Sequence, residues 1–337
     1  MLTQEFDYHL PRGLIAQKPL RPRDHSRLMI LNRDKKSITH DFFYNLDKYL
    51  TPHDLLIANN SQVIPARLKG QKNTQGKIEI LLLNPGQTKN SYEVMVKGKV
   101  KPDQEINFKK NLKAKFKKRL SAQTWIIEFN LPLEESFKKI EKIGQTPTPP
   151  YIKRTSNLKE YQTIYAQEPG SAAAPTAGFH FTKKLIKKLA KQNISLEFIT
   201  LHVGLGTFQP VRTKKVEDHK IHQERAKIKP SLAKKINQTK EKNQRIIAVG
   251  TTTTRVLEDF CQNKKIISGE KWVKNFIYPG YEFQIIDGLI TNFHLPQSSL
   301  LMMVSALAGK EFIKKAYQEA IKEQYRFYSF GDAMLII

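Results

Sequence analysis

The sequence contains a single cysteine, Cys261, among its 337 residues. One cysteine excludes an intrachain disulfide, a zinc site made of cysteines and a C-x-x-C redox pair. Long apolar runs are also missing: the longest, which starts at Leu300, is about half of the roughly 20 residues that a membrane span requires. The N-terminal segment carries acidic residues and a proline in place of the apolar core of a signal peptide. We therefore expect a protein of the reducing cytoplasm without a membrane partner.

Acidic residues are scarce relative to basic ones. The chain has 57 Lys and Arg against 31 Asp and Glu, a formal net charge of +26, which exceeds what solubility requires. A polyanionic partner such as a nucleic acid accounts for the excess, because cations that neutralise phosphates release bound counterions. A lysine-rich surface without any such partner accounts for it equally well.

The residues that are present indicate two domains. Between Gln62 and Pro150, apolar and polar residues alternate over short segments separated by turn residues, which is typical of an antiparallel sheet or a small barrel. Elsewhere strand and helix patterns follow one another, which indicates an α/β sheet. We predict a discontinuous α/β domain, residues 1–61 and 151–337, and a small all-β domain, residues 62–150, inserted into it.

Polar residues follow the predicted strands of the α/β domain. Ligands of open α/β sheets bind beyond the carboxyl ends of the strands, so these residues mark one candidate composite site. They are Asn60, His202, Thr251, Thr252, Asn292 and His294.

Two of the strand ends have further features. Gly204, Gly206 and Thr207 form a G-x-G loop, but Pro210 argues against the helix that a dinucleotide-binding motif needs next, so a tight turn is the simpler interpretation. The run TTTTR at 251–255 delivers hydroxyls and free amides to a helix N-terminus, which suits an anion. Ordinary threonine capping is the alternative there, and Arg255 favours a carboxylate or phosphate ligand.

Three histidines, His180, His202 and His294, adjoin strand ends or apolar segments and suit acid/base chemistry near neutral pH. For each one, a buried histidine bonded to a backbone carbonyl is the alternative. His219 and His222 lie three residues apart among carboxylates and resemble a metal site only loosely, because no third ligand is marked. A solvated helix face is the favoured interpretation of that pair.

Segments spread over nearly the whole chain resemble the S-adenosylmethionine:tRNA ribosyltransferase-isomerase family of queuosine biosynthesis. The chain departs from the family pattern where it has TTTTR in place of TTSVR, and the resemblance is weakest in the lysine-rich β segment. The segments are ANNSQVIPARLKG, PPYIKR, YQTIYA, AAAPTAGFHFT, TLHVGLGTFQPV, EDHKIHQE, AVGTTTTRVLE, FIYPGYEF, GLITNFHLPQSSLLMMVSALAG and YRFYSFGDAMLI.

This resemblance implies a Rossmann-like α/β domain joined to a six-stranded antiparallel β-barrel. It also implies a reaction: the ribosyl part of S-adenosylmethionine moves to 7-aminomethyl-7-deazaguanine at the tRNA wobble position and rearranges to epoxyqueuosine, releasing adenine and methionine. S-adenosylmethionine is then a co-substrate. We expect no resident cofactor, no metal, and a monomeric protein whose partner is that tRNA.

The implied reaction gives the candidate residues their roles. A base must remove a proton beside the sulfonium and an acid must protonate adenine, so His180, His202 and His294 are the acid/base candidates. Asp332 would orient one of them or face the sulfonium. Small residues around Ala174 would let the backbone lie against a flat ring on which Phe179 or Phe181 stacks. The other expected substrate contacts are Asn60, Gly204, Gly206, Thr207, Thr251, Thr252, Arg255 and Asn292.

The tRNA would be held by stacking on its anticodon loop and by cations on the flanking stem. Tyr278 and Tyr328 are the expected platforms, with core packing as the alternative. The segment 97–120 carries ten Lys or Arg against two acids, and its cations fall largely on one strand face, which is also compatible with a solvated surface. The expected stem contacts are Arg67, Lys97, Lys115 and Lys117.

Two other functions are compatible with the residues alone. A non-catalytic RNA-binding protein would explain the charge, but it leaves the polar strand ends without a purpose. A metal-dependent hydrolase would use His219 and His222, and metal analysis of the purified protein distinguishes it.

Overall fold

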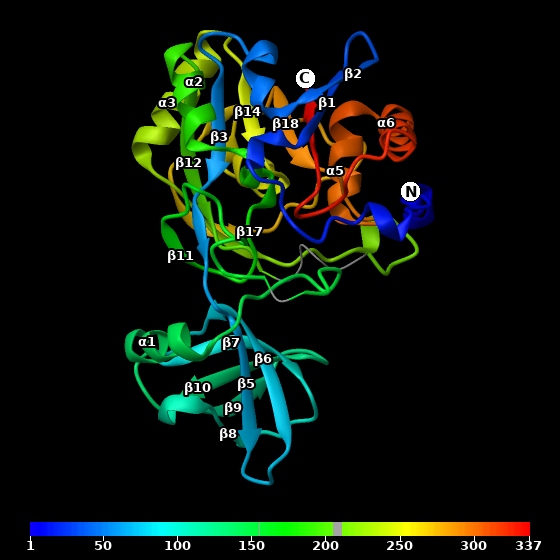
Figure 1. Ribbon diagram of the computed structural model, residues 1–337. Helices are drawn as coiled ribbons and strands as arrows, with labels where there is room; N and C mark the ends of the chain where they lie inside the picture. The colour runs from blue at the N-terminus through cyan, green and yellow to red at the C-terminus, as the bar shows by residue number, and fades with distance from the viewer. Residues whose placement is uncertain (155, 205–210) are drawn as a thin grey trace.

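The computed structural model describes residues 1–154, 156–204 and 211–337 and has two parts, an α/β part and a barrel (Figure 1). The α/β part is built on a nine-stranded sheet of order β17-β13-β12-β3-β14-β18-β19-β1-β2. Its strands are β1 Arg27–Asn32, β2 Ser37–Phe42, β3 Leu55–Asn59, β12 Ser195–Leu201, β13 Glu224–Ile228, β14 Ile246–Val249, β17 Gly269–Val273, β18 Gly288–Asn292 and β19 Ala333–Ile336.

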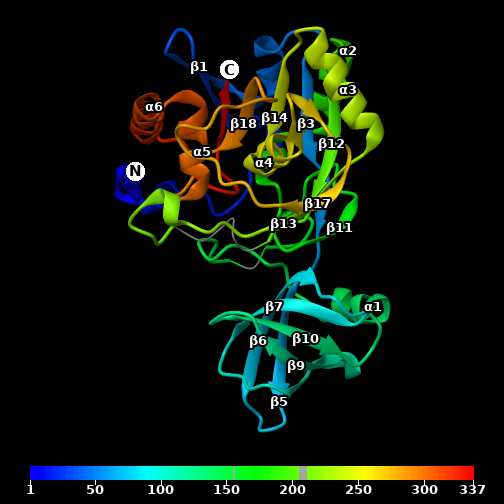
Figure 2. The ribbon, with the colours of Figure 1, turned by 180° about the vertical axis from the view of Figure 1, so that it is seen from behind.

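The four neighbouring strands β12, β3, β14 and β18 are parallel to one another. Their carboxyl ends therefore share one edge of the sheet, and this edge faces the barrel (Figures 1 and 2). β19 runs antiparallel to β18, with Asn292 paired to Ala333, so the start of β19 lies at the same edge. The predicted α/β sheet is confirmed, with a mixed rather than purely parallel strand arrangement.

Helices cover both faces of the sheet, which is why its central strands are apolar throughout. Successive side chains of β3 point to opposite faces: Leu55 and Ile57 belong to the apolar cluster that includes side chains of the helices α3 to α6, and Leu56 and Ala58 belong to the cluster that includes side chains of α2. The helices are α2 Lys183–Lys191, α3 Pro230–Glu241, α4 Thr251–Asp259, α5 Ser299–Ala308 and α6 Lys310–Lys322.

The ends of two helices follow from single residues. The hydroxyl of Thr182 accepts a hydrogen bond from the backbone N–H of Leu185 at 3.1 Å and caps α2. Gly309 has a φ of 93° and ends α5, a backbone conformation that glycine adopts without strain.

Four strands of the sheet, β1, β2, β13 and β17, were not predicted. Two of them, β2 and β17, form its outer edges and have few buried side chains.

The smaller part is a closed barrel of order β10-β7-β6-β5-β8-β9, in which all neighbouring strands are antiparallel. The six-stranded barrel is therefore confirmed, and its core consists of side chains that alternate along each strand. The strands are β5 Arg67–Lys72, β6 Lys77–Pro85, β7 Ser91–Lys97, β8 Glu105–Asn107, β9 Lys113–Arg119 and β10 Thr124–Phe129.

The inserted segment is not all-β, which corrects one expectation. Helix α1, Leu133–Ile143, follows the barrel strands, and its Ile140 is fully buried in the barrel core. Two short strands, β4 Ser61–Val63 and β11 Glu168–Ser171, pair in parallel where the chain enters and leaves the barrel. A separate hairpin joins β15 Cys261–Gln262 to β16 Lys265–Ile266. Cys261 lies in the first of these short strands and packs on the core, and burial raises the pKa of its thiol.

Candidate active site

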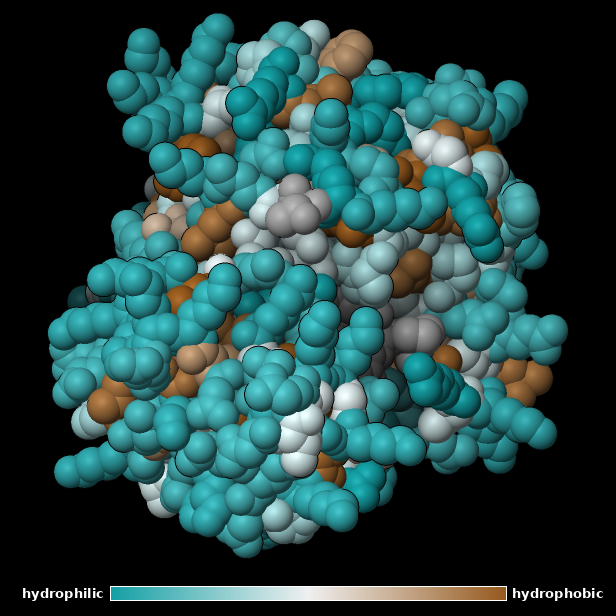
Figure 3. All heavy atoms as spheres, turned by 60° about the horizontal axis from the view of Figure 1, so that its bottom comes forward, coloured by the Kyte–Doolittle hydropathy of each residue, from teal (hydrophilic) through white to brown (hydrophobic). Residues whose placement is uncertain are grey.

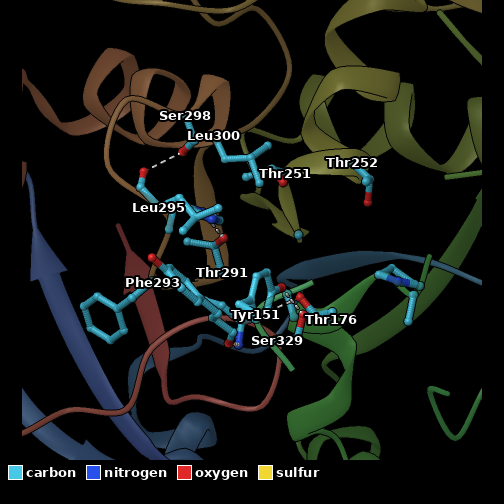
Figure 4. A pocket seen from close by; sticks show the side chains of 17 residues that line it. Tyr151, Thr176, Thr251, Thr252, Thr291, Phe293, Leu295, Ser298, Leu300 and Ser329 are labelled. Atoms are coloured by element: carbon cyan, nitrogen blue, oxygen red, sulfur yellow. Dashed lines mark hydrogen bonds between the residues drawn. The ribbon is translucent and has the colours of Figure 1, made fainter. Parts of the chain in front are cut away.

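A pocket opens at the carboxyl edge of the sheet, between the ends of β14 and β18. We call it the strand-end pocket. Its walls come from the start of α4, the end of β18, the start of α5 and three irregular segments, and Figure 4 shows the side chains arriving from these separate elements. The lining residues are Tyr151, Ala174, Pro175, Thr176, Ala177, Gly250, Thr251, Thr252, Thr291, Asn292, Phe293, His294, Leu295, Ser298, Leu300, Tyr328 and Ser329.

The pocket brings together six of the residues that the sequence analysis selected. They are Ala174, Thr251, Thr252, Asn292, His294 and Tyr328. Arg255 lines an adjoining pocket that shares Thr251, Thr252 and Leu300 with the first. The structure therefore supports a composite site at the strand ends, although not every selected residue lies in it.

His294 is the one candidate acid/base histidine that lines the pocket. Its Nε2 lies 2.9 Å from the hydroxyl of Thr291, and its Nδ1 has no hydrogen-bond partner among the residues that the structure describes. Two tyrosines hold its backbone: the hydroxyl of Tyr317 accepts a hydrogen bond from the N–H of His294 at 2.9 Å, and the hydroxyl of Tyr8 donates one to the carbonyl of His294. Burial lowers the pKa of His294 to about 3, so its imidazole is neutral at physiological pH.

His180 lies behind the pocket wall rather than in it. Its Nδ1 is 2.7 Å from the hydroxyl of Ser26, and its Nε2 accepts a hydrogen bond from the side-chain amide of Asn292 at 3.1 Å. Burial, reinforced by the charges of Arg23 and Arg326, lowers the pKa of His180 to about 3. Both nitrogens of this neutral ring are engaged, which matches a buried, satisfied histidine.

His202 lies apart from the other two histidines. It follows β12, which is separated from β14 by β3, and it lines neither of the two adjoining pockets. Burial and the charge of Arg225 lower the pKa of its ring, and its Nδ1 is buried with no hydrogen-bond partner within residues 1–154, 156–204 and 211–337. A side chain at Gly170 would collide with this ring, because a Cβ there would come within 2.9 Å of Nδ1.

Asp332 contacts no histidine. Its two carboxylate oxygens accept hydrogen bonds from the backbone N–H groups of Arg27, at 3.0 Å, and Arg326, at 2.8 Å. Burial raises the pKa of Asp332, while the same backbone bonds oppose that shift. The carboxylate ties the start of β1 to the loop before β19, and it does not line the strand-end pocket.

The small-residue segment supplies Ala174 to the pocket, but its aromatic rings are turned away. Phe179 stacks on Phe330 with ring centroids 5.8 Å apart and meets Tyr161 edge-on, and Phe181 packs edge-on against Phe43. Both rings are buried. The aromatic rings that do line the pocket as stacking surfaces are those of Tyr151 and Tyr328, which lie 4.8 Å apart.

The start of α4 has a side-chain hydroxyl that is free to bind a ligand. Gly250, with a φ of 91°, leads from β14 into the helix. Thr252 is 7 % exposed, its hydroxyl has no hydrogen-bond partner among the described residues, and it lines both adjoining pockets. By contrast, the hydroxyl of Thr253 donates to the carbonyl of Val249 at 2.8 Å. An orphaned hydroxyl at a helix N-terminus is where an anionic group would be stabilised.

Arg255 is already paired. Its Nη1 lies 2.6 Å from Oε2 of Glu224, and both side chains are almost fully buried. The other oxygen of Glu224 accepts from the N–H of Gly204 at 2.8 Å, and Nη2 of Arg255 donates to the carbonyl of His222. This ion pair fixes two loops beside the pocket, which leaves Arg255 little capacity for a substrate carboxylate.

The remaining expected substrate contacts lie elsewhere. The side-chain oxygen of Asn60 accepts from the hydroxyl of Thr200 at 2.8 Å, away from the pocket. Gly204 lines a hollow between the barrel and the α/β part. Gly206 and Thr207 lie outside the described residues, as does Pro210.

The expected tRNA contacts are spread over both parts of the molecule. Lys115 and Lys117 are exposed on β9, but each is ion-paired, with Asp103 at 3.1 Å and Glu128 at 3.2 Å. The expectation that the cations of β9 fall on one face is confirmed for Lys113, Lys115 and Lys117, which alternate with buried residues. The remaining expected tRNA contacts are Arg67, near Glu79; Lys97, exposed at the end of β7; Tyr278, packed beside Phe276; and Tyr328, buried in the pocket wall.

Sequence reasoning missed several pocket residues. Tyr151 comes from the proline-rich connector and bonds Ser329 at 2.6 Å between hydroxyls, and Thr176 donates to the amide oxygen of Asn292 at 3.1 Å. Both lie in segments without periodic pattern, so only their position next to selected residues could have drawn attention to them. Thr291 could have been predicted from the sequence, because it precedes Asn292 at the same strand end.

No group of three or more His, Cys, Asp or Glu side chains suited to a metal ion occurs within the described ranges. His219 instead meets Phe276 edge-on, with ring centroids 5.2 Å apart. Among the helices described, none is both long and apolar enough to cross a membrane.

Comparisons with known proteins cover the whole chain. Residues 3–336 match the family described as "Queuosine biosynthesis protein". Proteins called S-adenosylmethionine:tRNA ribosyltransferase-isomerase from Halothermothrix orenii and Carboxydothermus hydrogenoformans are 49% and 48% identical over the full length of both chains. The crystal structure of an S-adenosylmethionine tRNA ribosyltransferase from Thermotoga maritima aligns over 99% of this chain and 100% of that one, with a TM-score of 0.57 and 38% identity. The chain therefore belongs to the queuosine biosynthesis family of S-adenosylmethionine:tRNA ribosyltransferase-isomerases.

Proposed function

We propose that the protein transfers the ribosyl part of S-adenosylmethionine to 7-aminomethyl-7-deazaguanine at the wobble position of tRNA. The transferred group rearranges to give epoxyqueuosine, and adenine and methionine leave. The observation that carries this proposal is the neutral imidazole of His294 in a pocket whose lining also includes several hydroxyls, the amide of Asn292 and two tyrosine rings. Membership of the family is consistent with it over the full chain.

The chemistry requires a base that is neutral before it acts. The positive sulfonium acidifies the neighbouring C5′ hydrogens, so a positioned imidazole is able to remove one of them. His294 is held neutral by burial, and its Nδ1 has no partner in the part of the chain that the structure describes. We assign His294 to proton transfer with the substrate. Thr291 fixes the ring through the opposite nitrogen.

The other expected catalytic residues receive supporting roles in this proposal. His180 holds Asn292 in the pocket wall, and Asp332 holds the backbone at the start of β1. His202 lies too far along the sheet edge to share a substrate atom with His294, since two strands separate β12 from β18. Neighbouring strands lie about 4.8 Å apart. We therefore treat all three as positioning residues.

The substrate groups find complementary surfaces around His294. The methionine carboxylate would bind at the start of α4, where the helix dipole and the free hydroxyl of Thr252 favour an anion. A flat base would lie against the rings of Tyr151 and Tyr328, next to Ala174. In this arrangement Tyr328 serves as a platform for the tRNA base inside the pocket, and Phe179 supports the pocket from behind.

S-adenosylmethionine is consumed in the reaction and is a co-substrate, so the proposal requires no resident cofactor. The tRNA substrate places the protein in the cytoplasm. We further propose that the protein acts as a monomer, with the barrel holding the tRNA stem through its cations.

Release of adenine and methionine from S-adenosylmethionine tests the function. Purified protein should release both in equal amounts only when tRNA carrying 7-aminomethyl-7-deazaguanine is present, and tRNA with unmodified guanine is the matched control. Binding of the modified tRNA without release of either product would contradict the proposal and favour the non-catalytic RNA-binding alternative.

A further inference from the structure

The outer face of the barrel carries a groove that spans β7, β6, β5 and β8. We call it the lysine groove. Because strand residues alternate between the two faces of a sheet, its polar side chains point outward while Ile78 and Phe108 between them belong to the barrel core. Its lining residues are Lys69, Gly70, Gln71, Lys77, Ile78, Glu79, Lys97, Gly98, Asn107, Phe108 and Lys109.

The strand register aligns the charged side chains of the groove. Glu79 of β6 lies opposite Lys69 of β5 on one side and Lys97 of β7 on the other. Farther along, Gln71 of β5 lies opposite Lys77 of β6 and Asn107 of β8. The groove thus presents ammonium and amide donors across four adjacent strands, with one carboxylate among them.

The lysines of β9 differ in their surroundings. Lys113, Lys115 and Lys117 each form an ion pair, with Glu105, Asp103 and Glu128 at 3.3, 3.1 and 3.2 Å. Lys115 also lies between Glu105 and Glu128 on the two neighbouring strands. These carboxylates repel phosphates, so the positive charge of these three lysines is largely compensated at close range. Lys118 and Arg119, at the end of the same strand, form no ion pair among the described residues.

The lysines of the groove carry uncompensated charge. Within the described part of the chain, Lys69, Lys77, Lys97 and Lys109 form no ion pair, and all four are exposed. The groove's one carboxylate, Glu79, is 3.6 Å from Arg67 and so is itself partly neutralised. A phosphate backbone therefore meets a more favourable potential in the lysine groove than at the three paired lysines of β9.

The groove also has the location that a long substrate requires. The turn between β5 and β6 forms the end of the barrel farthest from the sheet (Figure 1), and that end has a mostly hydrophilic surface (Figure 3). An RNA stem whose loop enters the strand-end pocket extends away from it as a rigid A-form helix, which proteins hold through its backbone. We infer that the phosphate backbone of the tRNA stem docks in the lysine groove rather than on β9, an inference that rests on the proposed tRNA substrate.

The test compares tRNA binding by three triple variants of the full chain in a salt series from about 0.05 to 0.25 M. The groove variant is Lys69→Ala/Lys77→Ala/Lys97→Ala, and the β9 variant is Lys113→Ala/Lys115→Ala/Lys117→Ala. The matched control is Lys184→Ala/Lys187→Ala/Lys191→Ala on α2, where exposed lysines without ion pairs among the described residues lose the same charge.

The groove variant should bind tRNA roughly ten-fold or more weakly than the wild type, and the slope of log K against log salt should become shallower by about three. The α2 control should keep the wild-type slope, and the β9 variant should lose less affinity for tRNA than the groove variant. A wild-type slope in the groove variant, or a greater loss in the β9 variant, would overturn the inference.

Two further measurements keep the result interpretable. If the triple groove variant does not fold by circular dichroism, the single variants Lys69→Gln, Lys77→Gln and Lys97→Gln replace it, each with an expected slope change of about one. Adenine release by the wild type with modified tRNA is measured in parallel. Wild-type protein that binds tRNA but releases no adenine contradicts the proposed function, while the slopes still decide where the backbone docks.

Discussion

The side-chain nitrogen of Asn292 lies 3.1 Å from Nε2 of His180, and it donates a hydrogen bond to that nitrogen. The same amide donates to the carbonyl of Tyr328, and its oxygen accepts from Thr176, so the amide orientation is fixed on both sides. The proton of the neutral His180 ring therefore lies on Nδ1, directed at the hydroxyl of Ser26. The pocket wall depends on a histidine that must stay uncharged.

Acid should destabilise the fold through this histidine. The pKa of His180 is about 3 in the folded protein and about 6.5 in an unfolded chain. The unfolded state therefore binds a proton below pH 6.5 that the folded state does not, and stability falls as the pH drops from about 6.5 towards 3. Between pH 7.5 and 5.0 we expect His180 to account for a loss of about 2 kcal/mol in the free energy of unfolding.

Urea denaturation at both pH values measures this loss. The His180→Gln variant should show a pH-dependent loss about 2 kcal/mol smaller than the wild type, even if it is less stable at pH 7.5. The exposed His9→Gln variant is the control and should keep the wild-type pH dependence. Equal pH dependence in the wild type and His180→Gln would contradict a neutral, buried His180.

Replacing His294 should lower the rate of the reaction more than the affinity for the substrate. The His294→Ala variant should lower kcat for adenine release by about 10²- to 10⁴-fold, the usual contribution of a positioned acid or base. Its affinity for S-adenosylmethionine, measured by calorimetry, should change only a few-fold. His9→Ala should retain wild-type turnover. Wild-type kcat in His294→Ala would show that the proton transfer belongs to another group.

Thr252 and Thr253 are adjacent buried threonines that offer a matched pair. Thr252→Val removes a hydroxyl without a protein partner, so the free protein should be as stable or slightly more stable, and affinity for S-adenosylmethionine should fall about ten-fold. Thr253→Val breaks a bond to the carbonyl of Val249, so it should cost about 1 kcal/mol of stability and leave affinity unchanged. Thermal unfolding and calorimetry on both variants separate the two effects. Unchanged affinity in Thr252→Val would remove this hydroxyl from the site.

Arg255 and Glu224 should behave as one unit. Arg255→Ala leaves the buried carboxylate of Glu224 unpaired, which should destabilise the protein by about 3–5 kcal/mol. The double variant Arg255→Met/Glu224→Leu, which removes both charges, should recover most of this stability. Chemical denaturation of the single and double variants measures the coupling. Normal stability with lost affinity for S-adenosylmethionine in Arg255→Ala would instead support the expectation from the sequence that Arg255 contacts the substrate directly.

Much of the fold could be predicted because it depends on local patterns. Alternating residues in 62–150 indicated the barrel strands, and the helix ends at Thr182 and Gly309 likewise have local physical causes. The helix α1 was missed because the residues before it continue a strand-rich segment. The edge strands β2 and β17 were missed because an exposed strand has no apolar alternation to detect.

The sequence by itself determined the family, the two kinds of domain and the polar strand ends that could form a site. Only the tertiary structure decided which of those ends meet. β14 and β18 are neighbours and share a pocket, while β12 lies beyond β3 and carries His202 away from it. Tertiary contacts also decided which groups remain free, since Arg255 and His180 are engaged by partners distant in sequence and Thr252 is not. Strand order and burial depend on contacts between remote segments, and no local pattern records them.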